Sequence, residues 1–155
     1  MMVYQYLCPR HQQQVAVNPC AAFNWWLKSS ALAEQRFAAR DFTAARIFSG
    51  TAFEIALARL LMSQECVTAC DAQGDECAQR LAKSSRLRIR VLTQLGLLDE
   101  VEECLRATHQ ALAMVDAAGR MPVKSLLREF SQRARALLQM LGRAEEVLVP
   151  SARLN

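Results

Sequence analysis

The chain has 155 residues, of which 52% are hydrophobic and 22% are charged. A chain of this length and composition fits one folded domain with its own core and does not resemble a disordered segment. Its formal net charge of +4 at pH 7 permits an acidic peptide or a nucleic acid as partner and requires neither. No apolar run reaches the roughly 18 to 20 residues that cross a bilayer, so we expect no membrane contact.

The N-terminal residues, MMVYQYLCPRHQQQ, lack the charged lead and apolar core of a secretory signal. We therefore expect a cytoplasmic protein whose six cysteines are reduced thiols. Residues 1–22 contain Pro9 and Pro19, and each proline biases the residue before it away from helix. The prediction for residues 1–22 is an irregular N-terminal arm that packs on the domain that follows.

The next stretch predicts a helical hairpin. Residues 24–39 carry apolar side chains at every third or fourth position, which is typical of a helix with one buried face. A second helix is predicted over residues 42–62, and the carboxylate of Asp41 can cap its first turn. Gly50 lies inside this helix, at a cost of about 1 kcal/mol relative to alanine, so we expect it to allow close approach of another helix or a slight bend.

Glycine sets the rhythm of the remaining sequence, at Gly74, Gly96, Gly119 and Gly142. Glycine is favoured just past a helix end, and short connections force neighbouring helices to run antiparallel. The predicted segments are a loop at 71–75 and helices over 76–95, 98–117, 121–141 and 143–149. The whole prediction is an all-α domain over residues 23–149, with about three stacked antiparallel helical hairpins and a tail at 150–155. A closed helical bundle is the alternative.

The first hairpin resembles the tetratricopeptide repeat (TPR), a helix-turn-helix family with small residues where its two helices cross. The residues that carry the resemblance are Leu32 and Ala33, then Arg40, Asp41 and Phe42 at the turn, then Ala45 and Ala52. Ser49 and Arg36 stand where the family usually has a bulky residue and an aromatic one. The resemblance implies a TPR-like solenoid whose first helices line an inner groove, and a protein–protein interaction adaptor that is not an enzyme.

Two of the predicted helices carry basic stripes that would share this groove. At 100° per residue, neighbouring cations fall on one face of each helix. The stripes are Arg80, Lys83, Arg86 and Arg90 on the helix at 76–95, and Lys124, Arg128 and Arg135 on the helix at 121–141. Such a groove would bind an acidic segment or a terminal carboxylate of a partner protein by charge-assisted hydrogen bonds. Alternatively, the stripes are solvated faces or pair with the acidic helix between them.

Trp25 and Trp26 lie 100° apart on their helix, so both cannot point into one narrow stripe. We expect one of them to pack on the N-terminal arm. The other, taken as Trp26, is a candidate partner contact at the edge of the groove, and a core position for both is the alternative.

Two other functions stay open. Nucleic-acid binding through the same basic stripes ranks lower, because the sequence lacks basic residues interleaved with aromatic ones. A small zinc module is possible at Cys8, His11 and Cys20, but a structural zinc site takes four ligands, so we expect no bound metal. His11 and His109 have no evident catalytic partner in the sequence, and no phosphate loop occurs, so we expect neither catalysis nor a cofactor.

Overall fold

The structure, a computed structural model, describes residues 4–62, 71–119 and 123–142, with only the backbone for residues 71–75. Within these ranges the protein is all-α and contains no strand, which confirms the predicted fold class. In chain order the helices are α1 (Pro9–Val17), α2 (Pro19–Ala38), α3 (Phe42–Met62), α5 (Asp71–Gln94), α6 (Leu98–Ala117) and α7 (Lys124–Met140). The predicted helix at 143–149 and the tail at 150–155 lie outside the described residues.

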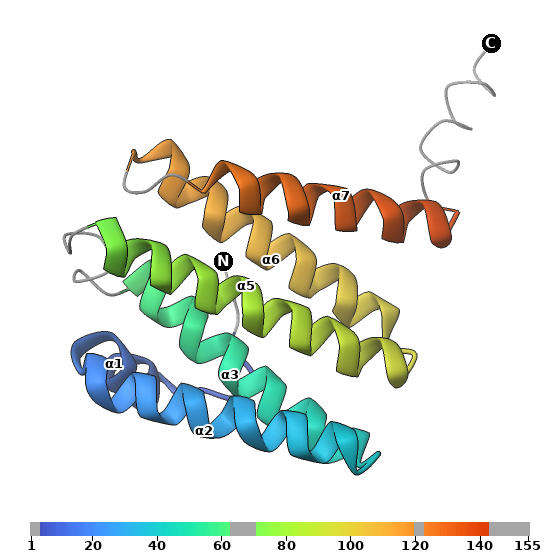
Figure 1. Cartoon of the computed structure of the whole chain (residues 1–155), viewed down its shortest axis with the longest axis horizontal. Helices are drawn as coiled ribbons and strands as arrows, with labels where there is room; N and C mark the ends of the chain where they lie inside the picture. The colour runs from blue at the N-terminus through green and yellow to red at the C-terminus, as the bar shows by residue number, and fades with distance from the viewer. Residues whose placement is uncertain (1–3, 63–70, 120–122, 143–155) are drawn as a thin grey trace.

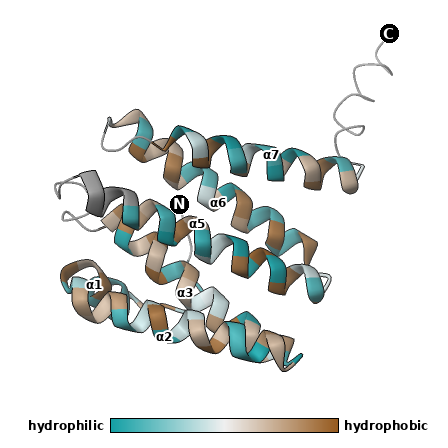
Figure 2. Ribbon diagram, in the orientation of Figure 1, coloured by the Kyte–Doolittle hydropathy of each residue, from teal (hydrophilic) through white to brown (hydrophobic). Residues whose placement is uncertain are grey.

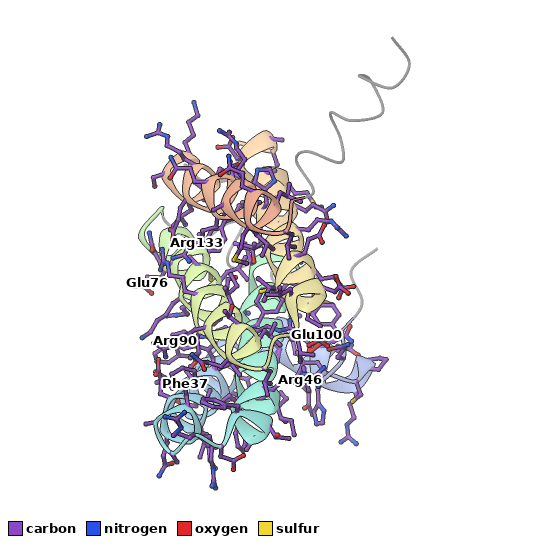
Figure 3. All side chains as sticks on the ribbon, turned by 90° about the vertical axis from the view of Figure 1, so that its right-hand side faces the viewer. Phe37, Arg46, Glu76, Arg90, Glu100 and Arg133 are labelled. Carbon is purple, nitrogen blue, oxygen red and sulfur yellow. The ribbon has the colours of Figure 1, made fainter. Side chains whose placement is uncertain are left out.

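From α2 onward, each helix packs mainly against its neighbours in the sequence and runs antiparallel to them (Figure 1). Viewed from the side, α2 and α5 lie in one layer, α3 and α6 lie in a second layer, and α7 packs on α6 at the end far from α2 (Figure 3). The helices α2, α5 and α7 therefore run in the same direction, and α3 and α6 run in the opposite one.

The central helix is α3, which packs on α1, α2, α5 and α6. Its residues from Ser49 to Ala58 are buried with one exception, Thr51, because neighbours cover the helix on most sides. The other helices alternate apolar and polar side chains, as expected where only one face is covered (Figure 2). One continuous core joins Val15 of α1 to Phe130 of α7.

The N-terminal segment differs from the irregular arm predicted for residues 1–22. Pro9 and Pro19 each occupy the first turn of a helix, where the missing N–H of proline leaves no helical hydrogen bond unmade. Asn18 ends α1 and caps α2, because its side-chain oxygen accepts a hydrogen bond from the amide of Ala21 at 3.1 Å. The prediction of an irregular arm is therefore wrong. It considered only that a proline interrupts a helix, whereas both prolines begin one here.

Tyr6, which precedes α1, packs directly over Gly50 of α3. A Cβ atom at position 50 would lie 2.1 Å from a carbon of the Tyr6 ring. The amide of Tyr6 donates to the carboxylate of Glu54, at 2.7 Å from Oε2, and this anchors the segment on α3. Gly50 therefore makes room for an aromatic ring, whereas the sequence predicted the close approach of another helix or a slight bend.

Three of the recurring glycines end helices as predicted. Gly96, Gly119 and Gly142 have φ values of 70°, 66° and 71°, a left-handed conformation that glycine adopts without steric cost. Gly74 is different, because α5 already includes it, so the loop predicted over residues 71–75 is wrong. A single glycine in a helix costs only about 1 kcal/mol, which the packing of the rest of α5 can offset.

Arg40 takes the place of such a glycine at the end of α2. Its φ is 61°, and no other non-glycine residue in the described ranges has a positive φ. The amides of Arg40 and Asp41 donate to the carbonyl oxygens of Phe37 and Arg36, at 3.0 and 2.9 Å, which is the Schellman pattern. The turn therefore has the geometry of a glycine turn but carries a side chain.

Because a Cβ atom disfavours the left-handed conformation by about 1–2 kcal/mol, Arg40→Gly is expected to raise the free energy of unfolding by about 1 kcal/mol. The reverse change at an equivalent turn, Gly96→Ala, is expected to lower it by a similar amount, since a Cβ there meets no other atom within 4 Å and only the backbone conformation opposes it. Urea denaturation followed by circular dichroism measures both. A less stable Arg40→Gly variant would contradict the assigned turn.

Candidate partner-binding groove

A groove of about 620 Å³ lies between α2 and α5, with one contribution from α7. Its apolar wall consists of Trp26, Leu27, Ala31, Leu87 and Ile89. Its charged residues are Glu34, Lys83, Arg86, Arg90 and, from α7, Arg133. The groove therefore combines an apolar surface with a surplus of basic side chains.

Trp26 forms the base of this groove and is mainly a core residue. Its side chain is only 6% exposed, and its indole Nε1–H donates to the hydroxyl of Ser84 on α5 at 2.7 Å. The ring of Phe23 stacks beside it at 6.1 Å between centroids. Trp26 is therefore buried and does not stand at the groove edge as predicted, although it is among the residues that line the groove.

The neighbouring Trp25 points the other way, as the 100° turn between adjacent helical residues requires. Its ring meets the ring of His11 on α1 edge-to-face, with 5.3 Å between centroids. One tryptophan therefore packs on the N-terminal segment, as the sequence predicted.

Lys83 and Arg90 stand on the α5 side of the groove. The ammonium group of Lys83 lies 5.6 Å from the centre of the Trp26 ring, and the side chain is exposed. The guanidinium of Arg90 donates to Glu34 of α2 at 2.6 Å and lies 4.6 Å from the centre of the Phe37 ring. Both cations therefore sit over aromatic rings, which favours a cation at these positions.

Arg86 joins α5 to α7 through a two-pronged ion pair. Its Nε and Nη2 donate to the two carboxylate oxygens of Glu129 at 2.8 and 2.6 Å, and Arg133 donates to the same carboxylate at 3.1 Å. These hydrogen bonds, above all those from Arg86, lower the pKa of Glu129, and the same contact raises the pKa of Arg86. Arg133 and Arg90 extend from the same side of the molecule, as Figure 3 shows.

The groove carries a net positive charge. Four cations line it, and two carboxylates, of Glu34 and Glu129, pair with three of them, which leaves a formal surplus of two positive charges. Within the described residues, no ion pair involves Lys83. Arg80, the remaining predicted residue on α5, lies just outside the lining; it pairs with Glu76 at 3.2 Å and stacks 4.4 Å from the Phe23 ring centre.

The basic stripe on α7 does not reach this groove. Lys124, Arg128 and Arg135 are exposed, on the side of α7 opposite the buried face that holds Phe130. The expectation that both stripes share one concave face is therefore wrong for α7, because its apolar face turns toward α6. The α7 residue that lines the groove is Arg133, and the only sequence signal for it is its i, i+4 spacing from Glu129.

The three candidate metal ligands are not brought together. The Sγ atom of Cys8 lies 3.3 Å from Nδ1 of His11, but Cys20 does not join them, and no group of three potential ligands exists within the ranges described. Cys8, Cys20 and Cys104 are free thiols, whereas Cys77 is disulfide-bonded. The expectation that every cysteine is reduced is therefore wrong at Cys77.

Comparison of the chain with protein-family models, with curated proteins and with solved structures found no match. In the portion of the chain that the structure describes, none of the helices has both the length and the apolar character to span a membrane. The geometry and the charge of the groove are therefore the observations that bear on function.

Proposed function

We propose that this protein is a TPR-like interaction adaptor that binds a partner segment with acidic and apolar side chains in the groove between α2 and α5. The observation that carries the proposal is the combination of a basic rim with an apolar wall. Leu27 is 44% exposed on this wall, and Phe23, one turn earlier on α2, is 37% exposed. An amphipathic helix from a partner would cover these side chains and present its carboxylates to α5.

The order of the helices supports a stacked-hairpin solenoid. The groove is lined by α2 and α5, which begin the hairpins α2–α3 and α5–α6, and by Arg133 of α7. In the tetratricopeptide family the first helices line the inner groove, so the residues of this groove agree with the resemblance seen in the first hairpin. The function inferred from the architecture is docking, with no chemical step.

The basic side chains of the groove can pair with a partner carboxylate at a small cost in free energy. Arg90 and Glu34 are each about half exposed, at 48% and 55%, and an ion pair this exposed contributes little to stability. A partner carboxylate could replace Glu34 as the acceptor for Arg90 and could also pair with Lys83. The exchange replaces the exposed ion pair of Arg90 by another, adds one at Lys83 and buries Leu27, so binding gains mainly from the apolar wall.

Nucleic-acid binding is the second candidate and is less well supported. The groove has a formal surplus of only two positive charges, and Arg86 is held in a two-pronged ion pair with Glu129, so few phosphates of a nucleic acid could be neutralised there. The α7 stripe, whose cations are exposed, lies on a different face.

The test selects helical peptides from a displayed random library against the wild-type protein and measures their affinity by fluorescence anisotropy. We expect the selected peptides to carry Asp or Glu beside apolar residues at i, i+3 and i+4 spacing. Lys83→Glu/Arg90→Glu is expected to weaken their binding by at least about tenfold, because like charges then face each other across the interface.

The matched control is Lys124→Glu/Arg128→Glu, which makes the same change in net charge on the outer face of α7. We expect it to retain affinity within about twofold. An equal loss in both double variants would show that overall charge, not the groove, attracts the peptides. Selection of no peptide, together with salt-dependent binding of a single-stranded RNA oligomer, would favour the nucleic-acid alternative.

A further inference from the structure

A second cavity, of about 400 Å³, opens between α3 and α6 in the layer away from the groove. Phe53 and Leu57 of α3 provide its apolar wall, and Ala107 of α6 extends it. Gln110 and Arg88 are among the polar residues that line it. The volume falls within the range of about 300–1,000 Å³ that is usual for small-molecule sites.

Arg88 is the unusual residue in this cavity. Its guanidinium lies 4.9 Å from the centre of the Phe53 ring, and the side chain is half-buried where α5 meets α3 and α6. Within the described residues, it makes no hydrogen bond and no ion pair. A guanidinium carries five N–H donors, and those of Arg88 have no protein acceptor among the described residues. Arg88 lines the cavity, so its donors are available to a ligand there.

Two carboxylates line the cavity, those of Glu54 and Glu103, and neither pairs with Arg88 among the described residues; Glu103 is exposed. Glu54 attracts Arg88 electrostatically, but both of its oxygens accept from the amide of Tyr6, at 3.1 and 2.7 Å. Burial of Glu54, which is 3% exposed, raises its pKa, so it favours the neutral form more than an ordinary carboxyl does. Arg106 at the rim donates to Glu102 at 3.1 Å, which leaves Arg88 as the cation of the interior.

We propose that this cavity binds a small organic oxyanion, with its carboxylate or phosphate group on Arg88 and a short apolar body against Leu57 and Ala107. The site is separate from the groove between α2 and α5, because the two have no lining residue in common. Arg88 would bind the anion in the two-pronged geometry that a guanidinium forms with carboxylate or phosphate.

The experiment titrates the full chain with isovalerate, with inorganic phosphate and with sodium chloride at matched ionic strength, and follows backbone amides by NMR. We expect saturable shifts at Ala107 and Gln110 with isovalerate or phosphate and none with chloride. Tighter binding of isovalerate is the expected result if the apolar body contributes as well as the anionic group. Failure of both probes to give saturable shifts up to about 50 mM, a concentration that detects even millimolar binding, would overturn the proposal.

Arg88→Met is expected to weaken the affinity for the tighter-binding probe by at least tenfold. Arg128→Met, at an exposed position, is expected to leave that affinity unchanged. Circular dichroism verifies that both variants fold. If Arg88→Met does not fold, Arg88→Lys keeps the charge without the planar fork, and we expect it to weaken binding several-fold. Unchanged affinity in Arg88→Met or in Arg88→Lys would refute the assigned role of Arg88.

Discussion

Trp26→Ala is expected to lower the free energy of unfolding by about 3–5 kcal/mol. The indole is 6% exposed, and its removal leaves a cavity among side chains from α2, α3 and α5, which the surrounding helices can close only in part. The substitution also removes the donor to the buried hydroxyl of Ser84. Urea denaturation, followed by circular dichroism because the main fluorophore is altered, measures the loss.

Trp25→Ala provides the matched control, because it removes the same side chain one position away. Trp25 is half-buried and contacts His11 on α1, so we expect a smaller loss of about 1–2 kcal/mol. Equal losses at the two positions would contradict the burial described for them. A double-mutant cycle of Trp26→Phe with Ser84→Ala isolates the hydrogen bond, with an expected coupling of about 1 kcal/mol.

Phe130→Ala is expected to lower the free energy of unfolding by about 3–5 kcal/mol, as much as Trp26→Ala. Phe130 is 0% exposed and is the only Phe, Tyr or Trp in the sequence after Phe53, so it is the one such side chain that α7 contributes to the core. Because α7 packs mainly on α6, we expect the loss of stability to affect α7 before the other helices. Hydrogen exchange of the α7 amides should accelerate more than exchange in α3.

The control for this variant is Gln132→Ala, an exposed position on the same helix, where we expect a change within about 0.5 kcal/mol. A loss below about 1 kcal/mol for Phe130→Ala would mean that α7 does not depend on its apolar face. Protection that falls uniformly over all helices would instead show that the stack unfolds as one cooperative unit.

The sequence allowed a close prediction of the helices whose apolar pattern and end signals agree. The helices at 42–62 and 98–117 have the predicted bounds, and Asp41 caps α3 by accepting from the amide of Ala44 at 3.2 Å. Prediction was wrong where one residue type has two local roles. Pro9 and Pro19 break helices in some contexts and begin them in others, and Gly74 is compatible with either a loop or a first helical turn.

The candidate site was predictable only in part. The basic stripe on α5 was visible in the sequence, and three of its members, Lys83, Arg86 and Arg90, line the groove. The role of Arg133 was not visible, because a side chain at the flank of a helix can face either neighbour. Arg88 interrupts the apolar stripe of α5, and no local pattern indicates that its guanidinium would meet a cavity wall.

The sequence by itself determined that the chain forms helices, where most of them end, and which side of each helix is apolar. These properties depend on periodicity and on local backbone preferences, which act over a few residues. Only the tertiary structure decided that α5 presents its cations to a groove while α7 turns its own outward. That outcome depends on how each helix rotates to bury its apolar face on its neighbours, and this rotation is set by contacts between residues far apart in the chain.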